Sequence, residues 1–281
     1  MIKDYFLLTK PGIIFGNAIT VLAGFFLAQR GSVDLVLLVA TLIGVSLVMA
    51  SGCVFNNVID RDIDAVMERT RNRALARGSI SPRGALVYGG LLGTLGLSLL
   101  YVYTNFLTAS VALLGLFVYV VIYTLLFKRH SGYGTFTGSI AGAIPPVLGY
   151  LAVSNTVDAG AVILFVILAL WQMPHSFAIA LYRIEDYTKA GVQVLPVKRG
   201  VLVTKVHTIV YVALFIIASL MLPVFGYVGQ MYFVVMLVVG LAWFLIATRG
   251  FGSKNDKLWA RSMFVFSILV VIIFSMMAIV G

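Results

Sequence analysis

Residues 35–64 have the sequence LVLLVATLIGVSLVMASGCVFNNVIDRDID. The stretch is almost wholly apolar from residue 35 to residue 55, which matches the roughly 20 residues that a helix needs to cross a bilayer core of about 30 Å. From Asn56 to Asp64 it then carries two amides, three carboxylates and one arginine. A predicted membrane helix therefore runs directly into a polar segment, and this segment is our first candidate for a functional site.

The composition of the whole chain agrees with a membrane protein. Of 281 residues, 61% are hydrophobic and 11% are charged, whereas a soluble domain carries about a quarter charged residues. The single cysteine, Cys53, excludes an internal disulfide, and no Cys/His cluster has the spacing of a zinc site. These values exclude an ordinary soluble enzyme, a disordered chain and a disulfide scaffold.

Nine stretches are long and apolar enough to span a bilayer. We therefore predict an all-α integral membrane protein that forms a single polytopic domain over residues 1–281. The predicted helices cover residues 12–29, 35–55, 84–103, 107–127, 137–153, 160–182, 204–224, 230–248 and 262–280.

The distribution of basic residues tests this number of spans. With nine spans, 19 of the 20 lysines and arginines fall on one membrane face, and Arg30 alone falls on the other. Because basic residues concentrate on the cytoplasmic side, we predict a cytoplasmic N-terminus. The net charge of +10 then mainly reflects the membrane topology of the chain. We expect a lipid bilayer as partner and no nucleic acid. The absence of an Arg- and Ser-rich transit peptide favours the plasma (inner) membrane of a bacterium.

The polar segment after residue 55 has the residue types of a magnesium site. At 100° per residue, Asn57, Asp60 and Asp64 share one helical face, with Cys53 one turn earlier. Two carboxylates and an amide oxygen suit Mg²⁺, which takes substrate phosphates as further ligands. The alternative is that this helix end is polar only because it meets water.

An arginine-rich segment follows the predicted magnesium site. Residues 69–77 contain four arginines, and the guanidinium group binds phosphate oxygens through two parallel hydrogen bonds. Lipid headgroup binding explains such a segment equally well when it is considered alone. Next to a magnesium site, diphosphate binding is the better interpretation. The candidate residues on this membrane face are Lys10, Arg69, Arg73, Lys128 and Arg129.

A second cluster lies at the end of the sixth span. His175, Tyr182 and Asp186 fall within about 20° of one another on a helical projection. Asp186 is then at the membrane boundary, with His175 roughly 16 Å deeper. This spacing predicts a site with a charged mouth and an aromatic interior. The alternative for His175 is a structural histidine that bonds to a neighbouring helix.

The motif Asn56-Asn57-x-x-Asp60-x-x-x-Asp64 resembles the first aspartate-rich motif of the UbiA prenyltransferase superfamily, with Asn57 in place of the first aspartate. The similarity extends over nearly the whole chain and is greatest to the branch that prenylates heme. It also involves the segments Thr9-Lys10-Pro11-Gly12, Ala143-Ile144-Pro145-Pro146 and Trp171-Gln172-Met173-Pro174-His175-Ser176. The second aspartate-rich motif of the superfamily is altered here and keeps Asp186.

The resemblance implies nine helices around a central cavity, Mg²⁺, farnesyl diphosphate as donor and heme B as acceptor. It also implies heme A synthase or oxidase assembly factors as candidate protein partners. Asp60, Asp64 and Asp186 would be catalytic, and these three with Asn57 would hold the metal. The residues expected around the prenyl chain and the acceptor are Tyr123, Trp171, His175 and Tyr182.

Two other functions remain open from the sequence. A prenyltransferase of the same family could act on a quinone precursor or another lipid, although the altered second motif argues against it. An ion-coupled transporter would place charged residues near the middle of the bilayer, whereas nearly all charges here lie at one membrane face.

Overall fold

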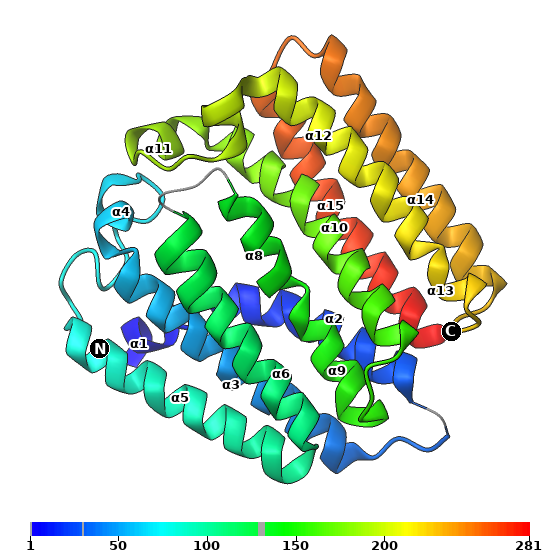
Figure 1. Cartoon of the computed structure of the whole chain (residues 1–281). Coiled ribbons are helices and arrows are strands. Elements are labelled where there is room, and N and C mark those ends of the chain that lie inside the picture. The colour runs from blue at the N-terminus through cyan, green and yellow to red at the C-terminus, as the bar shows by residue number, and fades with distance from the viewer. Residues whose placement is uncertain (1, 30, 129–132) are drawn as a thin grey trace.

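The computed structural model describes residues 2–29, 31–128 and 133–281, and every regular element in these ranges is a helix (Figure 1). The elements are α1 (Ile2–Leu8), α2 (Pro11–Ala28), α3 (Leu35–Ile59), α4 (Arg61–Val66), α5 (Pro82–Tyr103), α6 (Phe106–Phe117), the π-helix η1 (Val118–Phe127), α8 (Gly134–Gly142), α9 (Ile144–Ser154), α10 (Ala159–Tyr182), α11 (Ile184–Lys189), α12 (Leu195–Ser219), α13 (Met221–Val224), α14 (Gln230–Thr248), the 3₁₀-helix η2 (Arg249–Gly252) and α15 (Asp256–Val280).

Within these ranges, nine helical spans are long and apolar enough to cross a membrane, which confirms the predicted number. Two spans begin earlier than predicted. Helix α12 starts at Leu195 rather than at 204 and has a break at Gly200, where φ is 84°. Helix α15 starts at Asp256 rather than at 262. The first turns of both helices carry charged side chains, which lower hydropathy but do not prevent the backbone from forming helical hydrogen bonds.

Side-chain caps define where several spans begin. The carboxylate of Asp34 accepts hydrogen bonds from the backbone N–H groups of Val36 and Leu37, at 2.9 and 3.0 Å. Such caps pair the backbone donors that a helix leaves free in its first turn. The same kind of cap is formed by Ser81, Asn105, Asp158 and Asn255.

The fifth span lies at the centre of the bundle. Its most apolar window is 67% buried, compared with 17–44% for the other spans. The span is divided at Ala143 into α8 and α9, and Pro145 and Pro146 follow the break. Proline lacks a backbone N–H and disfavours a continuous helix, which explains a break at this point. All side chains of α9 from Ile144 to Ala152 are buried.

Helix α9 packs closely against α2. A Cβ atom at Gly24 would overlap the carbonyl group of Pro146, and one at Gly149 would overlap that of Val21. Small residues allow helix backbones to approach in this way inside membranes. The contact joins the first and fifth spans.

The two polar connections, α4 with its following loop and α11 with its following loop, lie together at one end of the bundle (Figure 1). Ile63 and Met67 pack against Val192, and Tyr187 and Val194 pack on this cluster. Two segments more than a hundred residues apart in the sequence therefore form one cap. We call this end of the bundle the polar end.

We expect Gly24→Ala to destabilise the protein because the added methyl group would push α2 away from α9. Overpacking of this kind costs about 1–3 kcal/mol. The melting temperature of the detergent-solubilised protein measures the effect. Gly16→Ala is the control, since Gly16 lies on the same helix with open space around its Cβ position. Equal melting temperatures for the two variants would contradict the proposed close contact.

Candidate functional site

A cavity of about 790 Å³ opens beneath the polar end of the bundle. Its walls come from α2, α3, the α6–η1 span, α8, α9, α10 and α15, and the loops after α4 and α11 line its mouth. The deeper part is apolar and is lined by side chains such as Val45, Val48, Leu116 and Leu148. The cavity therefore combines a charged mouth with an apolar interior, as in sites for amphiphilic ligands.

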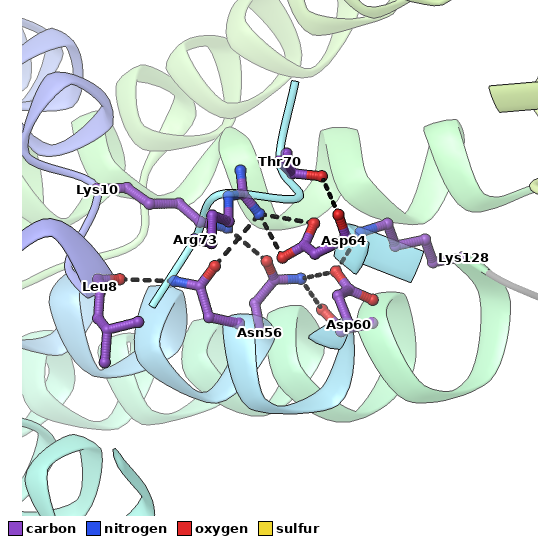
Figure 2. A network of polar contacts seen from close by, with 10 residues as sticks. Leu8, Lys10, Asn56, Asp60, Asp64, Thr70, Arg73 and Lys128 are labelled. Atoms are coloured by element: carbon purple, nitrogen blue, oxygen red, sulfur yellow. Dashed lines mark hydrogen bonds and ion pairs between the residues drawn. The ribbon is translucent and has the colours of Figure 1, made fainter. Parts of the chain in front are cut away.

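Asn56 is the hub of a polar network at the mouth (Figure 2). Its Nδ2 donates hydrogen bonds to Asp60 Oδ2 at 2.8 Å and to Thr124 Oγ1 at 3.2 Å. Its Oδ1 accepts a hydrogen bond from Lys10 Nζ at 2.5 Å. Lys128 Nζ forms an ion pair with Asp60 Oδ2. One amide thus links the start of α2, the end of α3 and the η1 helix.

Asp64 forms the second part of this network. Arg73 Nη1 lies 2.9 and 2.7 Å from the two carboxylate oxygens of Asp64, and it also donates to Asn57 Oδ1 at 3.2 Å. Asn57 Nδ2 in turn donates to the carbonyl oxygen of Leu8 at 2.8 Å. Figure 2 shows Arg73 between these acceptors. The arginine-rich loop is therefore folded back onto the aspartate-rich segment.

Both carboxylates are almost inaccessible to solvent. Asp60 is 1% exposed and Asp64 is 5% exposed. Burying a carboxylate is costly unless a cation and hydrogen bonds compensate for the lost hydration. Lys128 and Arg73 supply these cations.

Helix η1 explains how Tyr119, Tyr123 and Thr124 reach the site. The Thr124 hydroxyl donates to the carbonyl oxygen of Tyr119, five residues earlier, at 2.8 Å. Tyr119 and Tyr123 stack with ring centres 5.8 Å apart, and both line the cavity. Wide π-type turns are frequent at functional sites, and the apolar sequence of this span gives no signal for one.

The structure brings together most of the predicted metal and diphosphate ligands. Asn57 and Asp64 share Arg73 as a hydrogen-bond donor, and the backbone N–H of Asp64 donates to the carbonyl oxygen of Asp60 at 2.8 Å. Four of the five predicted phosphate-binding cations line the cavity, whereas Arg129 lies outside the described residues. These four are Lys10, Arg69, Arg73 and Lys128.

Asp186 stays a predicted metal ligand, and the structure places it on α11. Asp186, Asn57 and Asp60 are not among the residues that line the cavity, whereas Asp64 is. Within the described ranges, no three His, Cys, Asp or Glu side chains come together as a metal site would require. Helix α10 ends at Tyr182, so the helical projection that aligned Asp186 with His175 does not hold across Arg183.

Two of the four predicted cavity residues lie elsewhere. Tyr123 and Tyr182 line the cavity, but Trp171 and His175 do not. Trp171 Nε1 donates to the carbonyl oxygen of Ser267 at 2.8 Å, and His175 Nδ1 lies 2.7 Å from Ser267 Oγ. The face of α10 that carries these two rings packs on α15, while the adjacent face points into the cavity. His175 is thus bonded to a neighbouring helix, which was the structural alternative.

Other cavity residues were not identified from the sequence. Gln172 and Ser176 line the wall formed by α10, and Arg261 lines the wall formed by α15. A polar residue inside an apolar stretch is a usable signal for Gln172. Arg261 gives no such signal, because it falls among the other basic residues at the membrane boundary.

Lys10 has an unusual environment for a lysine. Burial, together with the positive charges of Arg73 and Lys128, lowers the pKa of Lys10 to about 8. Its backbone adopts the left-handed conformation, with φ of 54°. This conformation is strained for a residue other than glycine. The chain thus holds a readily deprotonated amine at the mouth of the cavity.

Comparison with known proteins identifies the family. The model of the UbiA prenyltransferase family matches residues 17–269. The chain belongs to the UbiA prenyltransferase family.

Relatives within this family are similar over their whole length. The chain is 55% identical to the protoheme IX farnesyltransferase of Edwardsiella ictaluri (strain 93-146) and 54% identical to that of Serratia proteamaculans (strain 568). Both alignments cover 99% of this chain and 94% of the relative. The family resemblance expected from the aspartate-rich motif is confirmed.

Solved structures share the UbiA fold. A structure of digeranylgeranylglyceryl phosphate synthase superimposes with a TM-score of 0.81 at 20% identity and covers 100% of this chain and 99% of that one. A UbiA homologue from Archaeoglobus fulgidus bound to GPP and Mg²⁺ gives a TM-score of 0.72 at 19% identity and covers 99% and 100%. The predicted fold class is confirmed.

We expect Asn56→Leu to lower the free energy of unfolding by about 1–3 kcal/mol, because a side chain of similar size would leave buried polar partners without hydrogen bonds. Thermal unfolding in detergent measures the change. The control is Asn17→Leu, since the Asn17 amide donates only to the carbonyl of Ile13 in its own helix. A smaller loss of stability for Asn56→Leu than for the control would contradict the role of Asn56 as a hub.

Proposed function

We propose that this protein transfers the farnesyl group of farnesyl diphosphate to a vinyl group of heme B, with addition of water, to give heme O and diphosphate. The observation that carries this proposal is the presence of two ion pairs, Asp64 with Arg73 and Asp60 with Lys128, at the mouth of a cavity with an apolar interior. It occurs in a chain that is 52–55% identical to protoheme IX farnesyltransferases over nearly its whole length.

The cations at the mouth would bind the diphosphate of the donor. Lys10 and Arg69 line the cavity, and no ion pair joins either of them to a carboxylate among the described residues. Arg73 and Lys128 lie beside them and are paired with Asp64 and Asp60. Preorganised cations stabilise the negative charge that develops on a departing diphosphate.

Asn57, Asp60 and Asp64 supply the oxygen donors that suit Mg²⁺. The two carboxylates and the amide come from one short segment, and Mg²⁺ takes its remaining ligands from water and substrate phosphate. The structure of the A. fulgidus homologue bound to GPP and Mg²⁺ supports a requirement for a divalent metal. When bound, the metal would neutralise charge on the leaving diphosphate. Asp186 on α11 stays a fourth candidate ligand.

The reaction begins when the bond between C1 of the farnesyl chain and the diphosphate oxygen breaks, and the diphosphate leaves with the electron pair. The stacked rings of Tyr119 and Tyr123 present π-electron density that stabilises the allylic cation. The terminal carbon of a heme vinyl group then bonds to C1. Water adds to the resulting carbocation beside the porphyrin and loses a proton, which leaves a hydroxyl group.

The apolar wall of the cavity holds the prenyl chain away from water. Val45, Val48 and Leu148 lie below the charged mouth, so the diphosphate and the chain have separate environments. Premature capture of the allylic cation by water is reduced where water is excluded.

The protein is a multi-pass membrane protein, and we propose that the polar end faces the cytoplasm. Positively charged segments stay on the cytoplasmic side during insertion, and α4 and α11 with their loops lie at one end of the bundle. Both the N-terminus and the mouth of the cavity would then be cytoplasmic, in the plasma (inner) membrane of a bacterium.

The purified protein should convert heme B to a farnesylated, hydrated heme when it is incubated with farnesyl diphosphate and Mg²⁺. Mass analysis of the extracted pigment measures the product. EDTA should stop the reaction and added Mg²⁺ should restore it. Failure to form farnesylated heme, where a known protoheme IX farnesyltransferase is active, would refute the proposal.

In the same assay, Asp64→Asn should reduce turnover by about a hundredfold or more, because loss of one charged group at a preorganised site commonly has this effect. Asp62→Asn is the matched control, since Asp62 lies two residues away and is exposed to solvent. Nearly equal activities for these variants would contradict the metal assignment.

The affinity for farnesyl diphosphate should fall as the pH rises through about 8. Lys10 has a lowered pKa of about 8, so it carries its charge below this pH and loses it above. Loss of a charge-assisted hydrogen bond corresponds to about a tenfold rise in KM. KM measured between pH 7 and 9 gives the profile. Lys10→Gln should remove this part of the pH dependence, and an unchanged profile would contradict the role of Lys10.

A further inference from the structure

The cavity contains more positive charge than one diphosphate accounts for. Among the residues that the structure describes, six basic side chains and one carboxylate, Asp64, line it. Lys10, Arg69, Arg73 and Lys128 belong to the donor end described above. Arg183 and Arg261 remain, and the donor molecule has no second anionic group for them.

Arg183 and Arg261 extend from two neighbouring helices. Arg183 follows the last residue of α10, and Arg261 lies in the second turn of α15. Helices α10 and α15 pack against each other. Both arginines therefore lie towards the polar end of one wall of the cavity.

These two arginines have no acidic partners among the described residues. No ion pair joins either one to a carboxylate in the described ranges. The guanidinium carbon of Arg183 lies 4.9 Å from the centre of the Tyr182 ring, which holds it by a cation–π contact. Their charges are thus available to an anionic ligand in the cavity, in contrast to those of Arg73 and Lys128.

The wall that carries these arginines differs from the wall that carries the donor network. Helix α15 packs on α2, α10 and α14, whereas η1 packs on α3, α6 and α8. Lys128 ends the η1 side, and Asp60 and Asp64 follow α3. The two groups of cations therefore extend from different elements of the cavity wall: Arg73 and Lys128 follow α4 and η1, whereas Arg183 and Arg261 belong to the end of α10 and the start of α15.

Heme B carries its anionic groups and its reacting groups on different edges of the ring. Its two propionate carboxylates lie on one edge of the porphyrin, and its vinyl groups lie towards the opposite edge. We propose that Arg183 and Arg261 bind the two propionates and thereby direct the vinyl edge towards the donor site. This inference rests on the proposed function and assigns to this chain the residues that position the acceptor.

Farnesylation assays with heme B and with heme B dimethyl ester test the proposal, because the ester lacks the two negative charges. Arg261→Gln should raise KM for heme B about tenfold to a hundredfold, the usual effect of losing a hydrogen bond between charged groups. KM for farnesyl diphosphate should not change, and this shows that the variant is folded. Arg183→Gln should behave in the same way.

The ester identifies the group that the arginines bind. With wild-type protein, esterification should raise KM by a similar factor, and Arg261→Gln should have little further effect on the ester. Arg261→Lys should restore part of the affinity for heme B. Lys257→Gln is the matched control, since Lys257 lies one turn earlier on the same helix and does not line the cavity. Its KM for both substrates should equal the wild-type value.

Three results would overturn the inference. An unchanged KM for heme B in both variants would show that neither arginine binds the acceptor. Equal penalties for heme B and its ester would assign the arginines to a lipid headgroup or to a structural role instead. Loss of affinity for farnesyl diphosphate in Arg261→Gln would place Arg261 at the donor site. In each case wild-type protein still farnesylates heme, whereas a wild-type protein without this activity would refute the proposed function itself.

Discussion

The burial of two carboxylates at the boundary of an apolar bundle is the constraint on which the polar end depends. Asp60 and Asp64 are nearly inaccessible, and neither could remain charged there without a cation close by. Lys128 and Arg73 meet this requirement. These pairs connect the end of α3 to η1 and to the arginine-rich loop, so one electrostatic requirement also determines where two other segments lie. Lys128 and Arg73 are also two of the cations that we propose to bind the diphosphate.

The bilayer imposes the second constraint. Backbone groups inside a membrane must be paired within the protein, and the helices satisfy this while leaving a central space. The divided fifth span occupies the middle of the bundle, and its close contact with α2 through Gly24 and Gly149 joins the first and fifth spans. Both of these spans contribute residues to the lining of the cavity, so the contact fixes two parts of its wall relative to each other. A charged mouth above such a space suits a substrate with an anionic head and a long apolar chain.

The division of cations between two walls extends this reasoning to the acceptor. One group of cations is interleaved with carboxylates and amides, as expected where a metal and a diphosphate bind. The other group, Arg183 and Arg261, lines the cavity and forms no ion pair with a carboxylate among the described residues. An acceptor with carboxylates on one edge and the reacting group on the other fits between them. Orientation of the acceptor would then follow from charge rather than from shape alone.

The sequence by itself determined the number of membrane spans, the helical fold class and the closeness of Asn57, Asp60 and Asp64 along the chain. These features depend on local hydropathy and on residues within a few turns of one another. Only the tertiary structure decided that Asp60 and Asp64 pair with Lys128 and Arg73, that Trp171 and His175 bond to Ser267, and that Arg261 lines the cavity. These outcomes depend on how each helix is rotated about its axis and on where it ends. Packing between distant segments determines both, and periodicity along the chain does not.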